Sequence, residues 1–165
     1  MSGGKMLRFL RADYKGKPNA DGSYIADLYR LVDLRPYRQD LADGNAKVQI
    51  SAAFNAIPFS QEEAYSCSVS GYALDAEMAR NAASLHDAID ANGSLAMARK
   101  RLANLDRDPG TWQKLDEELR LPAETEFLLV HIAVIPTGKS PRRITFDGQY
   151  VDDVRITLVR RSPVP

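Results

Sequence analysis

Hydrophobic residues in the first half of the chain recur mostly at alternate positions, the period typical of β-strands. Segments rich in Gly, Pro, Asn and Asp, which favour turns, separate four such runs. The predicted strands cover residues 5–12, 24–34, 46–54 and 64–73. The second run also fits a helical stripe, and we interpret it as a strand. A hairpin is expected between the first two strands, across residues 15–22.

The fourth predicted strand carries serines at alternate positions, namely Ser66, Ser68 and Ser70. Cys67 and Val69 lie between them in the sequence. Because successive side chains of a strand point to opposite faces, Cys67 and Val69 are expected to face the core. The serines are then expected to form a face in contact with solvent.

From residue 75 the spacing of apolar residues changes to steps of three and four, which is typical of amphipathic helices. A first helix is predicted after Asp75, a favourable N-cap, and it ends at residues 92–93. A second helix begins at Ser94 and packs on the first as a hairpin. A third begins at Asp108, which precedes a proline, and ends near Pro122. The three apolar stripes consist of Leu74, Met78, Ala82, Leu85 and Ile89; Leu95, Ala98, Leu102 and Leu105; and Trp112, Leu115 and Leu119.

Two further strands are predicted after this block, over residues 126–135 and 154–160. The first is apolar on both faces, as expected of a central strand in a covered sheet. The order of elements predicts an α+β fold, a mainly antiparallel sheet with a three-helix insertion (about residues 75–121) packed on one face. Residues 1–161 are interpreted as a single α+β domain, followed by a flexible C-terminal tail at 162–165.

Charge and composition narrow the class of function. The 22 basic and 22 acidic residues give a net charge of zero, which excludes the strongly basic surface of a dedicated duplex-binding protein. A net charge near zero gives little repulsion between molecules. This favours self-association into a homo-oligomer or a standing partner protein.

The expected location is cytoplasmic. The single cysteine, Cys67, cannot form an internal disulfide, and the first residues lack the apolar run of a secretory signal. The longest apolar stretch, residues 127–135, is too short to cross a bilayer and contains His131. We therefore expect a soluble protein with no membrane partner.

Candidate catalytic chemistry rests on two histidines, His86 and His131. Histidine suits proton transfer near neutral pH, and Asp87 follows His86 directly. His131 lies within the predicted central strand, where a buried imidazole is expected. Neither histidine has a second His or Cys at ligand spacing, so no metal site and no cofactor are predicted. Cys67 is expected to be a buried thiol rather than a nucleophile.

Candidate binding residues combine basic and aromatic side chains, which are enriched at the hot spots of protein interfaces and also stack on nucleic-acid bases. The first predicted contact patch consists of Tyr29, Arg35, Tyr37 and Arg38. The second consists of Lys139, Arg142 and Arg143, in a connection between predicted strands. A further basic run, residues 99–101, is interpreted as the outer face of the second predicted helix.

The favoured function is a non-catalytic protein-binding module, a small accessory, inhibitor or adaptor protein that docks onto a partner protein. The alternative is a nucleic-acid-binding module for single strands or RNA that uses the same local basic patches. A third hypothesis is a small acid/base enzyme that uses His86 or His131. No catalytic residue is assigned.

Overall fold

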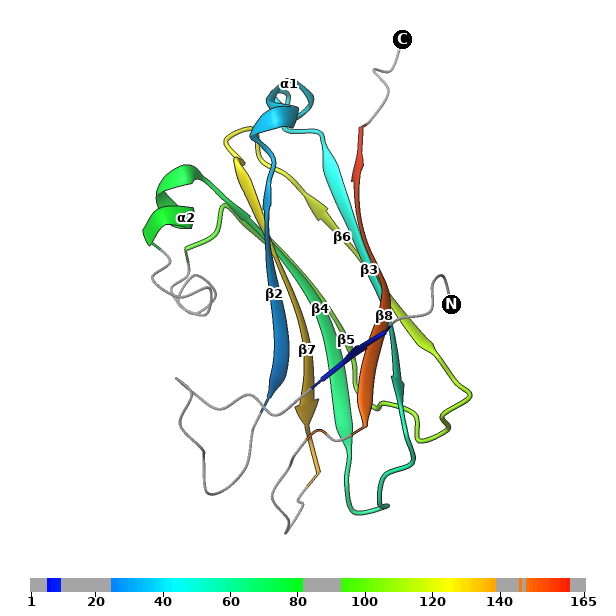
Figure 1. Ribbon diagram of the computed structural model, residues 1–165. Helices are drawn as coiled ribbons and strands as arrows, with labels where there is room; N and C mark the ends of the chain where they lie inside the picture. The colour runs from blue at the N-terminus through cyan, green and yellow to red at the C-terminus, as the bar shows by residue number, and fades with distance from the viewer. Residues whose placement is uncertain (1–5, 10–24, 82–92, 139–145, 147, 161–165) are drawn as a thin grey trace.

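Two antiparallel β-sheets stack on each other in the computed structural model, which describes residues 6–9, 25–81, 93–138, 146 and 148–160 (Figure 1). The strand order in one sheet is β1-β8-β3-β6, made of Leu7–Arg8 (β1), Gln149–Val159 (β8), Lys47–Ala56 (β3) and Gln113–Arg120 (β6). The order in the other is β2-β7-β4-β5, made of Ala26–Asp33 (β2), Phe127–Pro136 (β7), Tyr65–Leu74 (β4) and Ala96–Leu102 (β5). The helical elements are short and comprise Arg35–Tyr37 (η2), Arg38–Leu41 (α1) and Ala76–Asn81 (α2).

The predicted α+β fold with a three-helix insertion is therefore wrong, and the described chain is a β-sandwich. The second and third predicted helices are strands β5 and β6. The first begins as predicted, because Asp75 Oδ1 accepts a hydrogen bond from the Met78 amide at 2.7 Å and caps α2. Its predicted continuation through residues 82–92 lies outside the described residues.

A shared spacing explains the error in β6. Leu115 and Leu119 are four residues apart, which places them on one face of a helix and equally on one face of a strand. In β6 both are buried against the core. Glu117 lies between them on that face and interrupts the alternation of apolar residues, so the strand pattern is obscured.

The predicted N-cap at Asp108 is a turn residue. Its carboxylate accepts hydrogen bonds from the Gly110 amide at 2.9 Å and from the Thr111 hydroxyl at 3.0 Å. Asp favours helix N-caps and such turns for the same reason, a short side chain that accepts bonds from nearby amides. The residue type alone could not separate the two structures.

The strongly alternating segments are strands as predicted, and they form β2, β3, β4, β7 and β8. Strand β7 lies between β2 and β4, which confirms its central position. The hairpin predicted between the first two strands is wrong, because β1 pairs with β8 in one sheet and β2 pairs with β7 in the other. The tail 162–165 lies outside the described residues.

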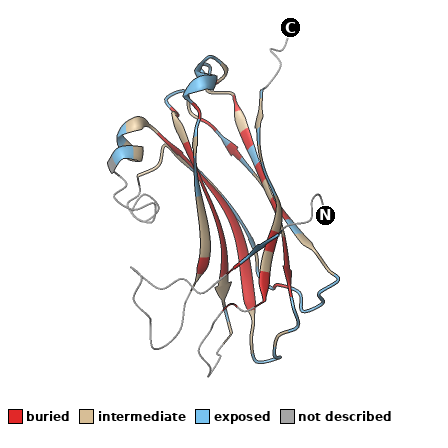
Figure 2. Ribbon diagram, viewed as in Figure 1, coloured by how far each residue is buried: buried red, intermediate tan, exposed pale blue. Residues whose placement is uncertain are grey.

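The core lies between the two sheets, where large apolar side chains from both are fully buried (Figure 2). Gly71 of β4 allows the sheets to approach closely. A Cβ at this position would lie 2.6 Å from Cδ1 of Ile50 in β3, well inside a normal contact. The missing side chain thus provides the space that Ile50 fills.

The sandwich differs between its two sides. On one side β5 packs against β6. On the other, β2 is the marginal strand of its sheet, and β8 is followed at the margin of the other sheet only by the two-residue β1, which in Figure 1 runs from β8 toward β2. Among the described strands, β2 pairs only with β7, and β1 covers only Tyr150 and Val151 of β8. Much of the outer backbone edge of both strands therefore has no strand partner within the described part of the chain.

Candidate functional site

The structure brings three of the four residues of the first predicted patch to one end of the sandwich. Arg35 and Tyr37 belong to η2, and Arg38 begins α1, directly after β2. Pro36 favours this turn because its ring fixes φ near the helical value and it lacks the backbone N–H that a strand would use, so it suits the first turn of a helix. The chain therefore leaves β2 and places these side chains at the surface.

Arg35 is held by two neighbours. Its Nε and Nη2 donate to the two oxygens of Asp33 at 2.9 and 2.7 Å, and its guanidinium lies 4.9 Å from the centre of the Phe127 ring. The hydrogen bonds from Arg35 lower the pKa of Asp33 from 3.8 to about 2. The charge of Arg35 is thus compensated within its own turn.

Tyr37 and Arg38 are less constrained. Tyr37 is 46% exposed, and the side chain of Arg38 is 73% exposed. Arg38 Nη2 lies 3.7 Å from a carboxylate oxygen of Glu126, a separation at which exposed pairs contribute little. An aromatic ring and a cation are therefore available at this end of the molecule for contact with another molecule.

Tyr29 lies elsewhere, on the surface of the sheet that faces away from the core. Its ring stacks on His131 with centroids 4.4 Å apart and planes inclined by 8°. Its hydroxyl donates to Asp27 at 3.0 Å. It lies six positions before Arg35, up to about 20 Å along an extended chain, so the four residues do not form one compact patch.

The second predicted patch cannot be placed. Lys139, Arg142 and Arg143 lie outside the described residues, and so do His86 and Asp87.

His131 is buried, as predicted, with 6% of its surface exposed. Its Nε2 lies 3.3 Å from Oδ2 of Asp27, so a carboxylate faces this nitrogen. Its Nδ1 is buried without a hydrogen-bond partner among the described residues. Asp27, Tyr29 and His131 thus form a cluster that joins β2 to β7. Within it, Asp27 and His131 are 104 positions apart in the sequence.

The predicted solvated serine face is wrong, because Ser66, Ser68 and Ser70 are all buried. They lie on the surface of the β2-β7-β4-β5 sheet that faces away from the other sheet, and we call this surface the serine face. Register places Ser70 between His131 of β7 and Arg99 of β5.

Two arginines of β5 lie over these serines. Arg99 Nε donates to Ser70 Oγ at 3.0 Å, and its Nη2 donates to the Tyr72 hydroxyl at 2.7 Å. Arg101 Nη2 donates to Ser66 Oγ at 2.9 Å. The basic run was expected on a helix surface, and the strand instead places alternate members, Arg99 and Arg101, on the serine face.

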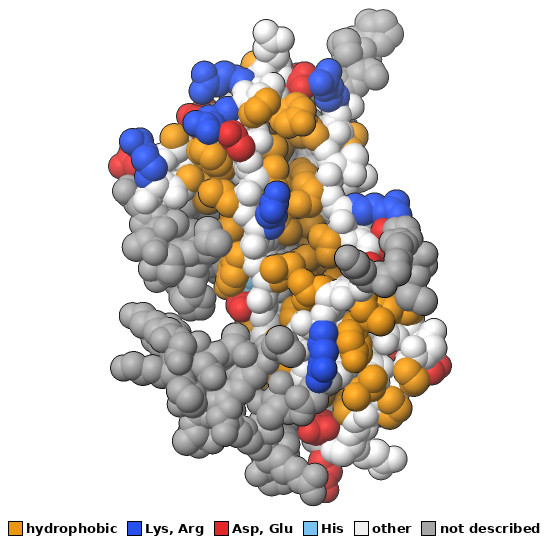
Figure 3. All heavy atoms as spheres, viewed as in Figure 1, with side chains coloured by type: hydrophobic (Ala, Val, Ile, Leu, Met, Phe, Trp, Pro, Cys, Tyr) orange, Lys and Arg blue, Asp and Glu red, His pale blue; other side chains and the backbone are white. Residues whose placement is uncertain are grey.

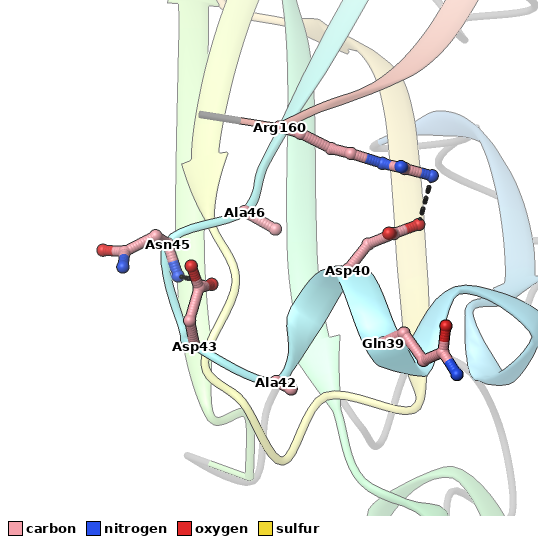
Figure 4. A pocket seen from close by; sticks show the side chains of 7 residues that line it. All are labelled: Gln39, Asp40, Ala42, Asp43, Asn45, Ala46 and Arg160. Carbon is pink, nitrogen blue, oxygen red and sulfur yellow. Dashed lines mark hydrogen bonds and ion pairs between the residues drawn. The ribbon is translucent and has the colours of Figure 1, made fainter. Parts of the chain in front are cut away.

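A shallow pocket of about 240 Å³ lies beside α1 and the end of β8 (Figure 4). Asp40 of α1 pairs with Arg160 across it at 2.5 Å, and Asp43 accepts a hydrogen bond from the Asn45 amide at 2.9 Å. The side chains of Asp40, Arg160 and Asp43 therefore each have a partner within the protein. Asp40 and Arg160 neutralise each other, and the carboxylate of Asp43 is bound to a backbone amide, so these contacts do not define a ligand for the pocket.

Cys67 is a buried free thiol, as predicted. Burial in the core raises its pKa to about 12. A thiol of this kind is protonated at neutral pH and is a poor nucleophile.

Among the described residues, no group of three or more His, Cys, Asp or Glu side chains is arranged to hold a metal ion. No helix in the described ranges is both long and apolar enough to cross a membrane. The chain matches no protein-family model and no curated protein.

Proposed function

We propose that this protein is a non-catalytic binding module that docks onto a partner protein in the cytoplasm. The docking surface is the open side of the sandwich between β2 and β8, continued by the η2–α1 turn. We call it the β2–β8 surface. Its members are Leu28, Arg30 and Val32 of β2, Val154, Ile156 and Leu158 of β8, and Tyr37 and Arg38.

The observation that carries the proposal is the exposed apolar area on this side. Val154 is 42% exposed, and the other apolar side chains of the surface on β2 and β8 are only partly buried. Hydrophobic side chains form a band over the middle of the face that Figure 3 presents, with single basic groups within it. Contiguous apolar surface of this kind marks interaction sites on soluble domains.

Arg30 gives the surface its charge preference. By alternation it shares the core-facing side of β2 with Ala26 and Val32, yet it is exposed because it stands at the open margin. It has no ion-pair or hydrogen-bond partner among the described residues. A cation beside apolar surface favours a partner that brings a carboxylate to it.

The form of the partner follows from the edge of β2. Eight residues of this strand lie at the margin of their sheet. A free edge accepts an extended segment, which adds to the sheet by backbone hydrogen bonds and places alternate side chains against the surface. The expected occupant is an extended segment of a partner protein with apolar residues and an acidic residue opposite Arg30.

The test is affinity purification from the native cytoplasm with three forms of the protein. The Arg30→Glu/Tyr37→Ala variant removes the cation and the exposed ring. Lys114→Glu is the matched control, an exposed basic residue on β6, the margin of the other sheet on the opposite side. Both substitutions leave the core intact, and circular dichroism checks that each variant is folded.

The proposal expects a stoichiometric protein that co-purifies with the wild type and with Lys114→Glu and is lost with Arg30→Glu/Tyr37→Ala. Nuclease treatment must leave this protein bound. Equal recovery with both variants would overturn the placement of the surface. Recovery that disappears with nuclease would replace the proposal by the nucleic-acid alternative, since such binding depends on phosphate contacts.

A further inference from the structure

We propose that the partner's segment pairs with the backbone of β2 and not with that of β8, and that it carries an acidic residue between two apolar residues on the side that faces the core. This inference rests on the docking surface proposed above. It adds which of the two edges binds and which sequence pattern that edge selects. The acidic residue lies opposite Arg30, and the two apolar residues lie opposite Leu28 and Val32.

The edge of β2 is regular along its whole length. All eight residues pair with β7 without a register shift, from Ala26 opposite Val134 to Asp33 opposite Phe127. None of them has a positive φ, and none is a proline. In an antiparallel sheet, alternate N–H and C=O groups of an edge strand point away from its only neighbour. Strand β2 therefore presents an evenly spaced row of donors and acceptors to an incoming segment.

The edge of β8 is interrupted. Strand β1 already occupies it at Tyr150 and Val151. Directly beyond these residues, the pairing of β8 with β3 shifts register between Ser51 and Ala53, and Asp153 has a φ of 51°. A bulge of this kind twists an edge strand and breaks the spacing of its hydrogen-bonding groups. The segment is therefore expected to pair with β2, while β8 contributes side-chain contacts only.

Alternation along β2 determines where each side chain of the segment points. Residues directly opposite each other on neighbouring strands lie on the same face of a sheet. Leu28, Arg30 and Val32 share the core-facing side, so the segment residues opposite them point toward the gap between the sheets. Ile156 and Leu158 pack against the core from the margin of the other sheet and are only partly buried. Apolar residues opposite Leu28 and Val32 bury this remaining apolar surface.

The position between them selects charge. Arg30 is exposed and has no ion pair or hydrogen bond with the described part of the chain. An apolar residue opposite it would remove water from an uncompensated guanidinium, which is costly. A carboxylate opposite it forms a charge-assisted hydrogen bond instead, since the Cβ atoms of directly opposite residues lie about 5 Å apart. Aspartate or glutamate is therefore expected at this position.

The probe is a synthetic peptide, acetyl-Thr-Val-Leu-Glu-Thr-Val-Thr-amide. Its central glutamate can lie opposite Arg30 with its two valines opposite Leu28 and Val32, whether the peptide runs parallel or antiparallel to β2. The control peptide, acetyl-Thr-Val-Glu-Leu-Thr-Val-Thr-amide, exchanges the glutamate with the neighbouring leucine. This exchange turns the charge to the other face of the sheet, while composition and net charge stay the same.

A charge exchange tests the role of Arg30. The Arg30→Glu variant should lose the preference for the first peptide. It should also bind a third peptide, acetyl-Thr-Val-Leu-Lys-Thr-Val-Thr-amide, more tightly than the wild type does. Lys114→Glu is the matched control, because it makes the same change of charge at the margin of the other sheet. A gain of affinity in the exchanged pair could not come from a misfolded variant.

Binding is followed by amide chemical shifts in NMR spectra, and backbone pairing is followed by amide hydrogen exchange. The wild type and Lys114→Glu should bind the first peptide about tenfold more tightly than the control peptide, because a charge-assisted hydrogen bond contributes about that factor. Alternate amides of β2 should exchange more slowly in the complex. Amides of residues 154–158 in β8 should exchange at unchanged rates.

The proposal is overturned if the first peptide does not bind, if the two peptides of equal composition bind equally, or if Arg30→Glu gains no affinity for the lysine peptide. Protection of β8 amides in place of β2 amides would also overturn it. If the co-purifying protein is nevertheless lost with Arg30→Glu/Tyr37→Ala, the docking surface stands and only the strand pairing is refuted. Retention of that protein by the variant refutes the docking surface itself.

Discussion

Replacing Gly71 by alanine should destabilise the sandwich through a single identifiable contact. The added Cβ would lie 2.6 Å from Ile50 Cδ1, about 1 Å inside a normal carbon–carbon contact. Leu119 Cδ2 at 3.4 Å and Leu128 Cδ1 at 3.7 Å limit movement of the methyl group on other sides. Ile50 is fully buried, so any rotation that relieves the clash must displace neighbouring side chains of a close-packed core.

The magnitude follows from two opposed effects. Inserting a methyl group into a packed core costs about 1–3 kcal/mol. Alanine in place of glycine within a strand recovers about 0.5–1 kcal/mol. The expected net loss in the free energy of unfolding is therefore within about 0–2.5 kcal/mol, with a central value of about 1 kcal/mol. Urea unfolding followed by the fluorescence of Trp112, the single tryptophan, measures it.

A double-mutant cycle tests the cause. Ile50→Val removes Cδ1, the atom that clashes, and costs about 0.5–1.5 kcal/mol alone. In that background Gly71→Ala should be neutral or stabilising, because its methyl group enters the vacated volume. The reasoning is refuted if Gly71→Ala has the same effect in both backgrounds, or if it does not destabilise the wild type.

Three further outcomes are expected. The bonds from Arg35 lower the pKa of Asp33 from 3.8 to about 2, so their stabilisation is fully present above pH 3.8 and is lost as the pH falls toward about 2. The difference in urea midpoint between the wild type and Asp33→Asn should therefore shrink as the pH falls through this range. A constant difference would contradict the ion pair's contribution. Cys67, with its pKa raised to about 12, should react with a thiol reagent at pH 8 only after unfolding, and rapid reaction of the folded protein would contradict its burial. Asn55 Nδ2 donates to the carbonyls of Pro109 and Thr111 at 3.0 and 2.8 Å, so Asn55→Ala should cost about 2 kcal/mol in urea unfolding. Asn55→Asp should cost more, because a carboxylate would face two carbonyl oxygens, and equal or smaller losses would contradict these contacts.

The part of the fold that could be predicted from sequence is the part that local patterns determine. Strands β3, β4 and β7 have clear alternation or continuous apolar runs, and their positions follow from them. Strands β5 and β6 could not be distinguished from helices, because Leu115 and Leu119 satisfy both periods and Glu117 breaks the alternation. The pairing of β1 with β8 joins opposite ends of the chain, and no local pattern specifies it.

The same distinction applies to the candidate sites. Arg35, Tyr37 and Arg38 are neighbours in the sequence, so their proximity could be predicted. The contact of Asp27 with His131 depends on the pairing of β2 with β7. The bonds of Arg99 and Arg101 to the serines were missed because they require residues 96–102 to be a strand. The alternating serines were the available signal, because hydroxyl groups repeated on one face of a strand indicate polar partners on that face.

The measurement that tests the proposed docking most directly is photo-crosslinking in the cells that make the protein. A photoreactive amino acid replaces Tyr37 in one form and Lys114 in the other, both of them exposed positions. The β2–β8 surface predicts a discrete covalent product with another protein from position 37 and none from position 114. The same product from both positions, or no product from position 37, would contradict docking through this surface.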